Sequence, residues 1–159
     1  MSAIQPHGGT LVNRLAEGAE RERLLTEAEG LRAINVDAWT ISDIDCIAVG
    51  AFSPLTGFLK ENDYRSVVET MRLGDGTVWS IPVTLPVDEE TFAAMEPGER
   101  VALVGAEDNI VYAILHAEEK YRVDLEREAE KVFKTTDPAH PGVAKLFDRG
   151  NRYVGGSIT

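Results

Sequence analysis

Residues 100–115 read RVALVGAEDNIVYAIL, and this stretch does most to decide the fold. Two apolar runs rich in β-forming residues, 100–104 and 110–115, flank a turn that contains Asp108 and Asn109. Short apolar runs on either side of such a turn predict a β-hairpin. We therefore expect the sheet of this protein to be built around residues 100–115.

A second run rich in β-forming residues, VWSIPVTL, lies upstream at 78–85. Its Pro82 lacks an N–H group, so we expect that residue at a sheet edge or a bulge. Helix-forming patterns surround both runs. They predict helices over 16–32, 40–49, 60–73 and 124–134, with a short helical turn over 143–147.

Helix caps are expected at Thr40 or Ser42 for the second helix and at Asn62 or Asp63 for the third. A helical first half, followed by short strands with helices between them, indicates an α+β protein with a small sheet or partly closed barrel. A length of 159 residues suits one domain over 1–159.

The charge balance excludes some classes of function. The chain carries 16 Lys and Arg residues against 27 Asp and Glu residues, a net charge of −11. A protein that tracks a nucleic-acid backbone needs clustered Lys and Arg, so we expect no nucleic-acid partner. No apolar run approaches the roughly 18 residues of a membrane helix. The single Cys46 excludes an internal disulfide framework, and we expect a cytoplasmic protein with no membrane contact.

Few residues are candidates for a metal site or an anion site. His7, His116 and His140 each stand alone, so we expect no metal site. The locally basic stretch with Lys145 is a weak candidate for an anion site, formed by His140, Arg149 and Arg152. Ordinary surface charge is the favoured alternative for these residues.

The helix over 124–134 is strongly charged. Glu126, Glu128 and Glu130 alternate with Arg127 and Lys131, a pattern that predicts a solvated helix face. By contrast, residues 50–58 contain two Phe residues and are expected to form a packed loop, because burial of aromatic rings is favourable.

Several segments together resemble one family. They are PHGGTLVNR (6–14), GAFSPLTGF (50–58), Asp63-Tyr64 through Met71-Arg72-Leu73, VWSIPVTLP (78–86), His140-Pro-Gly-Val143 and Tyr153-Val-Gly-Gly156. Their order and spacing resemble the amino-terminal domain of sulfate adenylyltransferase (ATP sulfurylase), in its bacterial, Bacillus-like branch. The resemblance covers essentially the whole chain.

This resemblance implies a PUA-like fold, a small β pseudo-barrel with surrounding helices. It also implies a parent nucleotidyltransferase of sulfate assimilation, in which a sulfate oxygen attacks the α-phosphorus of MgATP to give adenosine 5′-phosphosulfate and pyrophosphate. In the family, the ATP-binding groups belong to a second, carboxy-terminal domain with a Gln-x-Arg-Asn stretch and paired histidines. That domain is the expected partner, and a homo-oligomer is a further expectation.

This chain contains neither of those motifs, and its only Gln is Gln5. The family's catalytic domain is expected after residue 159. We therefore assign no catalytic, cofactor-binding or metal-binding residue to this chain, with MgATP bound only in the complete enzyme. The candidates for packing or for a domain junction are Gly50, Phe52, Pro54, Leu55, Gly57, Phe58, Tyr153, Gly155 and Gly156.

Two functions follow from this resemblance. The first is a supporting domain of sulfate adenylyltransferase that is inactive alone. The alternative is a stand-alone PUA-like module that binds RNA or a protein, against which the dispersed Lys and Arg residues argue.

Overall fold

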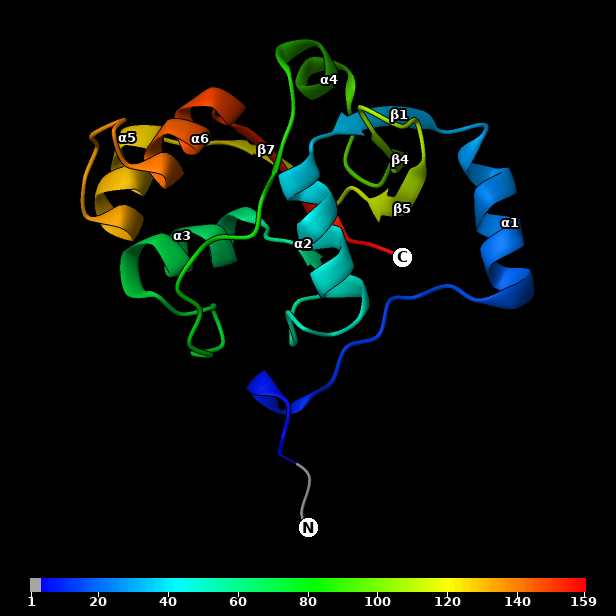
Figure 1. The fold of residues 1–159 in the computed structure, drawn as a ribbon, viewed down its shortest axis with the longest axis horizontal. Coiled ribbons are helices and arrows are strands. Elements are labelled where there is room, and N and C mark those ends of the chain that lie inside the picture. The colour runs from blue at the N-terminus through cyan, green and yellow to red at the C-terminus, as the bar shows by residue number, and fades with distance from the viewer. Residues whose placement is uncertain (1–3) are drawn as a thin grey trace. The chain divides into compact units, whose positions relative to one another are not determined.

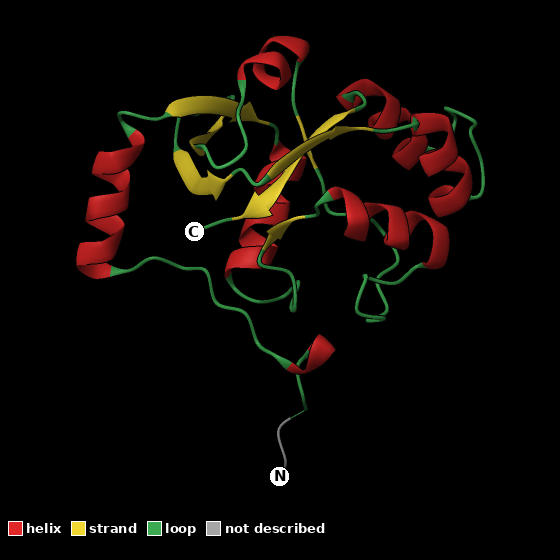
Figure 2. Cartoon of the chain, turned by 180° about the vertical axis from the view of Figure 1, so that it is seen from behind, coloured by secondary structure: helices red, strands yellow, loops and turns green. Residues whose placement is uncertain are grey.

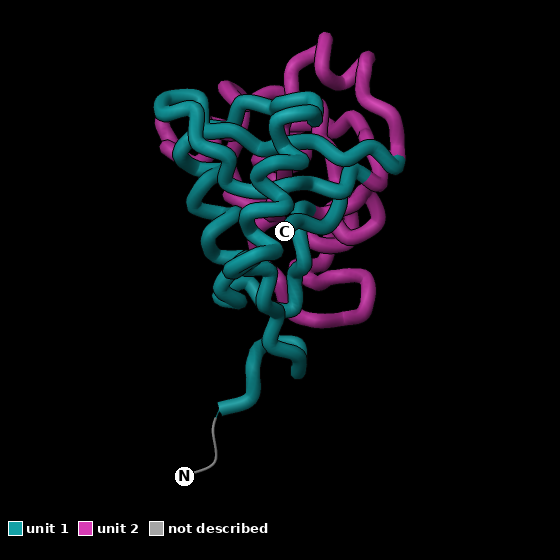
Figure 3. Tube along the Cα trace, turned by 90° about the vertical axis from the view of Figure 1, so that its right-hand side faces the viewer, with its two compact units in different colours: residues 1–58, 98–117, 156–159 teal, residues 59–97, 118–155 magenta. Residues whose placement is uncertain are grey.

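The computed structural model describes residues 4–159, which divide into two compact units. Unit 1 contains the described residues through Phe58, together with Gly98–Ala117 and Gly156–Thr159. Unit 2 contains Leu59–Pro97 and Glu118–Gly155, as the two colours of Figure 3 show. The chain therefore passes from one unit to the other four times.

The helices and strands alternate irregularly along the chain, as Figure 1 shows by label and colour. In order they are η1 (His7–Gly9), α1 (Gly18–Ala28), β1 (Arg32–Val36), α2 (Ala38–Ala48), β2 (Gly57–Phe58), α3 (Glu61–Thr70), β3 (Leu85–Pro86), α4 (Glu89–Ala94), β4 (Arg100–Gly105), β5 (Val111–His116), β6 (Glu119–Arg122), α5 (Leu125–Glu128), η2 (Ala129–Phe133), α6 (Pro141–Arg149) and β7 (Arg152–Ser157).

Unit 1 contains a three-stranded sheet in the order β1-β4-β5. Strands β4 and β5 pair antiparallel, which confirms the hairpin predicted over 100–115. Val101, Ala102 and Leu103 are all buried, so both faces of β4 are covered. On one side α1 packs against the sheet, where Leu24 and Ala28 meet residues of β4 and β5.

Strand β1 corrects the prediction of one helix over 16–32. The helix ends at Ala28, and Arg32 begins a strand that pairs parallel with β4. A parallel partner 69 residues along the chain leaves no local signal, because parallel strands need long crossover connections.

The cap of α2 differs from both predicted residues. The carboxylate of Asp37 accepts hydrogen bonds from the Thr40 amide and hydroxyl, both at 2.9 Å. Asp37 is therefore the cap, and the helix begins earlier than expected. In α3 the prediction of Asn62 or Asp63 is also wrong, because Lys60 precedes the helix and makes no side-chain cap.

Unit 2 contains an antiparallel arrangement in which β7 lies between β6 and β3. Tyr121 of β6 faces Tyr153 of β7, and Pro86 of the edge strand β3 also pairs with Tyr153. In unit 1 the end of β7 pairs with β2, through Phe58 and Gly156. Figure 2 shows these strands in yellow among the helices of the chain.

The predicted strand over 78–85 is largely wrong, because only Leu85 of that run lies in a strand. Pro82 offers no N–H to a neighbouring strand. The Ile81 carbonyl accepts a hydrogen bond from the indole N–H of Trp79 at 2.8 Å, instead of one from a neighbouring strand. Val78 forms only an isolated bridge, with Arg72.

The short helical turn expected over 143–147 is the longer helix α6, with His140 as its cap. The charged helix expected over 124–134 is present as α5, continued by the wider turns of η2. The predicted α+β class is confirmed, with the strands arranged in open sheets.

Candidate functional site

The most unusual polar group of unit 2 is Glu128, at the end of α5. Only 4% of Glu128 is exposed, so the prediction of a solvated face is wrong for this residue. One of its carboxylate oxygens, Oε2, accepts two hydrogen bonds. The Tyr64 hydroxyl donates at 2.7 Å and the Tyr153 hydroxyl at 3.0 Å.

A third tyrosine completes this group, which we call the tyrosine–glutamate cluster (Tyr64, Tyr121, Glu128 and Tyr153). The Tyr121 hydroxyl donates to the Leu59 carbonyl at 2.6 Å. The rings of Tyr121 and Tyr153 meet edge to face with centroids 5.9 Å apart, and Tyr64 lies 5.6 Å from each. Three rings from α3, β6 and β7 thus pack together beside one carboxylate, and two of the three pairs have the edge-to-face geometry that aromatic rings favour.

Burial governs the protonation of this cluster. It raises the pKa of Glu128, while the two tyrosine hydrogen bonds and the positive charge of Arg149 lower that pKa in part. Burial and the nearby carboxylate also raise the pKa of each of the three tyrosines, which keeps their hydroxyls protonated as donors. The arrangement therefore holds an acceptor and its donors together, as a structural polar core does.

Charged side chains beside the cluster pair with one another. A pocket of about 350 Å³ is lined by Arg65, Glu69, Arg127 and other residues of unit 2. Arg127 donates to Glu69 at 2.6 Å, and Arg65 donates to Glu61. These cations are partly neutralised by their own neighbours, so the pocket does not present concentrated positive charge to an anion.

The loop over 50–58 is held by short polar contacts in unit 1. Ser53 is buried, and its hydroxyl accepts from the Val12 amide at 2.9 Å and donates to the Gly50 carbonyl at 2.7 Å. Gly50 has φ +84°, and a Cβ there would lie 2.3 Å from the Val12 carbonyl oxygen. This crowding explains why glycine occupies the start of the loop.

The other junction candidates of that loop lie at varied depth. Leu55 and Phe58 are buried, Phe52 is half-buried, and Pro54 packs close to Gly8. A Cβ on Gly57 would lie 1.9 Å from the Gly156 carbonyl oxygen. Strands β2 and β7 therefore approach more closely here than a side chain would permit.

The remaining junction candidates belong to β7. Tyr153 is part of the tyrosine–glutamate cluster, and Gly155 lies where a Cβ would be 2.6 Å from the Leu59 carbonyl oxygen. The structure thus brings Gly57 together with Gly156 in unit 1, whereas Tyr153 and Gly155 are residues of unit 2.

The three anion-site candidates do not converge on one point. His140 precedes α6 and Arg149 ends it, so about 13 Å of helix separates their backbones. The His140 Nδ1 atom accepts from the Gly142 amide. In β7, the Arg152 Nε atom lies 3.4 Å from a Glu89 carboxylate oxygen.

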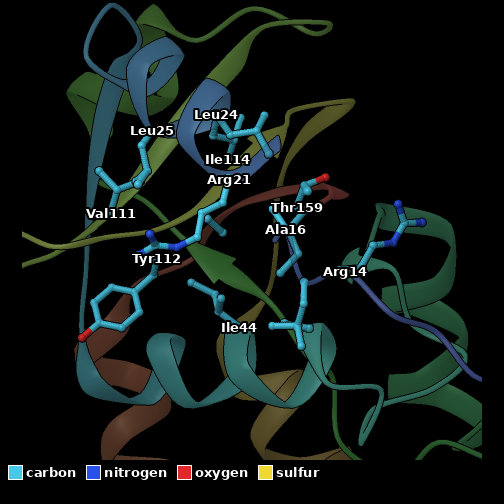
Figure 4. A pocket seen from close by; sticks show the side chains of 14 residues that line it. Arg14, Ala16, Arg21, Leu24, Leu25, Ile44, Val111, Tyr112, Ile114 and Thr159 are labelled. Carbon is cyan, nitrogen blue, oxygen red and sulfur yellow. The ribbon is translucent and has the colours of Figure 1, made fainter. Parts of the chain in front are cut away.

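Unit 1 has a pocket of about 230 Å³, with apolar walls from α1, α2 and β5. Figure 4 shows Leu24, Ile44 and Ile114 among its lining side chains. Arg21 extends beside the Tyr112 ring, while Arg14 points away in the opposite direction. The two guanidinium groups therefore do not meet on a shared ligand.

Within residues 4–159, no three His, Cys, Asp or Glu side chains are grouped closely enough to hold a metal ion. Over the same residues, no helix has the length and apolar character needed to cross a membrane.

Sequence reasoning missed Glu128, Tyr64, Tyr121 and Ser53. Tyr64 is spaced three and four residues from Val67 and Val68, and this apolar helical spacing is a usable signal. A buried tyrosine hydroxyl needs a hydrogen-bond partner, so Tyr64 predicts a buried acceptor somewhere in the chain. The sequence alone does not say which of many carboxylates it is.

Comparison with known proteins agrees with this architecture. The family described as "PUA-like domain" matches residues 4–159. A sulfate adenylyltransferase of Halothermothrix orenii is 50% identical over 98% of this chain, which spans 41% of that protein. A protein of Sorangium cellulosum named "Probable bifunctional SAT/APS kinase 2" is 46% identical over 98% of the chain, which spans 26% of it.

Among solved structures, "Hexameric APS kinase from Thiobacillus denitrificans" matches with a TM-score of 0.72 and 28% identity. The match covers 98% of this chain and 26% of that one. The chain thus spans between 26% and 41% of the length of these three proteins. These matches do not favour the alternative of a stand-alone binding module. The chain belongs to the PUA-like domain family, and it corresponds to the amino-terminal part of relatives named sulfate adenylyltransferase.

Proposed function

We propose that this chain is the supporting amino-terminal domain of a sulfate adenylyltransferase. The observation that carries the proposal is the 50% identity to the Halothermothrix orenii protein along nearly the whole chain. The proposed parent reaction joins ATP and sulfate to give adenosine 5′-phosphosulfate and pyrophosphate. The sulfate oxygen forms a bond to the α-phosphorus, and the bond from that phosphorus to pyrophosphate breaks.

That reaction brings two anions together, so its site needs cations and amide donors aimed at them. This chain supplies a net charge of −11, and several of its arginines pair with its own carboxylates. We therefore assign MgATP and sulfate to the carboxy-terminal part of the enzyme. The chain itself contributes no catalytic, cofactor-binding or metal-binding residue.

The supporting role rests on built-in rigidity. The tyrosine–glutamate cluster ties α3, α5 and β7 together through one buried carboxylate. A domain fixed in this way can hold a catalytic partner in place without touching the substrate. The loop over 50–58 and the Tyr153–Gly156 segment remain the proposed packing and junction elements.

The partner in this proposal is the catalytic part of the same enzyme, in the cytoplasm. A homo-oligomer is also proposed, since the solved neighbour is described as hexameric.

The test is sulfate-dependent release of pyrophosphate from MgATP, with molybdate as an alternative anion. The 159-residue chain is compared with the polypeptide encoded by the complete gene. We expect release only from the longer polypeptide. Release by the 159-residue chain alone would show that the active site has been misplaced, with His140, Arg149 and Arg152 the first residues to mutate. A folded longer polypeptide that releases no pyrophosphate would refute the enzyme assignment.

A further inference from the structure

An exposed apolar hairpin follows α3 in unit 2 (Figure 1, green). We call residues 71–81 the apolar hairpin. Its exposed side chains are Met71, Val78 and Ile81, with exposed fractions of 39%, 52% and 55%. Trp79 lies between them and is half-buried. Five large apolar residues lie within these eleven positions, the buried Leu73 included, and three of them are exposed, which is more than the scattered single residues that need no explanation.

The apolar hairpin is firmly built. The Leu73 amide donates to the Thr77 carbonyl and the Trp79 amide to the Met71 carbonyl, each at 2.8 Å. At its tip, the Gly74 amide donates to the Asp63 carboxylate, also at 2.8 Å. A segment held by this many bonds loses little further freedom when another surface covers it, which favours binding.

The sequence of this segment also conflicts with its structure. The run from Val78 is rich in β-forming and apolar residues, yet most of it lies outside any strand. Disagreement between a local pattern and the folded state marks functional positions more often than others. Met and aromatic residues are moreover enriched in protein–protein interfaces.

We propose that the apolar hairpin is the surface on which the catalytic part of the same polypeptide docks. This inference rests on the proposed function. More than half of the Halothermothrix orenii relative lies outside the part matched by this chain. That remainder is therefore large enough to form a folded partner.

Electrostatic complementarity at the apolar hairpin favours this partner over a second copy of the chain. Two copies would each carry −11, and like charges oppose direct contact between two hairpins, so the proposed homo-oligomer is assigned to other surfaces of the enzyme. A domain that binds ATP and sulfate must present positive charge, which complements the net charge of −11 on this chain.

The experiment is hydroxyl-radical labelling read by mass spectrometry, on the 159-residue chain and on the polypeptide encoded by the complete gene. We expect labelling of Met71, Val78 and Ile81 to fall roughly fivefold in the longer polypeptide, because the core of an interface is packed like a protein interior. Pyrophosphate release is measured on the same samples.

A matched pair of variants provides the second measurement. Val78→Ser with Ile81→Ser should loosen the docking and raise labelling of Met71 in the longer polypeptide toward its level in the short chain. Ile110→Ser, at a residue 54% exposed in unit 1, should leave Met71 protected. Thermal unfolding of the 159-residue variants shows whether the substitutions leave the domain folded.

The outcomes separate the two proposals. An active longer polypeptide with a fully labelled hairpin overturns the docking surface and leaves the function standing. An inactive one with a protected hairpin overturns the function and supports the docking surface. Protection that appears in the 159-residue chain as its concentration rises assigns the hairpin to a second copy and overturns the proposed partner.

Discussion

Replacing Glu128 by Ala should destabilise the chain far more than any exposed acidic substitution. The change leaves the hydroxyls of Tyr64 and Tyr153 buried without their acceptor. Each unsatisfied buried donor costs about 1–3 kcal/mol. Removing the carboxylate also removes the cost of burying it, which offsets part of this loss, so we expect a net loss of about 3 kcal/mol.

The assay is urea unfolding of the 159-residue chain at pH 7, followed by circular dichroism and by fluorescence. Glu126→Ala is the matched control, because Glu126 is exposed two residues away on the same helix. We expect it to change the free energy of unfolding by no more than about 0.5 kcal/mol. Equal losses for the two variants would refute the assignment of Glu128 as a buried acceptor.

A combined variant tests the reasoning from the opposite direction. Glu128→Leu with Tyr64→Phe and Tyr153→Phe removes the acceptor and both donors together. Replacing every polar partner by apolar groups of similar shape is often nearly neutral. We therefore expect the triple variant to be more stable than Glu128→Ala, and a loss larger than that of the single variant would contradict the account.

Three further predictions concern other contacts. Gly57→Ala should lower the free energy of unfolding in urea by more than about 3 kcal/mol, since the new Cβ would lie 1.9 Å from the Gly156 carbonyl oxygen. Gly30→Ala, whose Cβ would make only an ordinary contact at 3.7 Å, should change the free energy of unfolding little. Lys120→Met should lower the free energy of unfolding by about 1.5–3 kcal/mol and speed amide exchange in α4. The reason is that the Lys120 ammonium donates to the carbonyls of Phe92 and Met95 at the end of that helix, at 2.8 and 2.6 Å. Lys131→Met, which loses only an exposed ion pair, should lower it by about 0.5 kcal/mol or less. Burial raises the pKa of Glu128 from its ordinary 4.5, so the native state retains a proton that the unfolded chain releases. The free energy of unfolding, measured relative to Glu128→Gln, should therefore decline as pH rises from about 4.5 through the raised pKa and then level off. Urea unfolding curves over that pH range will check this.

The elements that sequence patterns predicted correctly are those built from local contacts. The hairpin over 100–115 and the helix carrying Tyr64 and Val67 depend on residues close together in the chain, so their apolar spacing is visible in the sequence. Strand β1 was missed because its partner is far along the chain.

The candidate site was predicted poorly for a related reason. Glu128 lies in a helix whose charges alternate, and that pattern favours solvent exposure. Its burial is decided by Tyr64 and Tyr153, which are 64 and 25 residues away. A carboxylate is buried only where donors meet it, and those donors are brought there by tertiary structure rather than by the helix itself.

The chain crosses from one unit to the other four times, and this limits how genetic recombination can separate the two units. Unit 1 is assembled from three stretches of sequence and unit 2 from two. A single genetic breakpoint anywhere within residues 4–159 would therefore leave at least one unit without one of its stretches. Recombination can move this domain between genes only as a whole, so its two units are expected to share one evolutionary history.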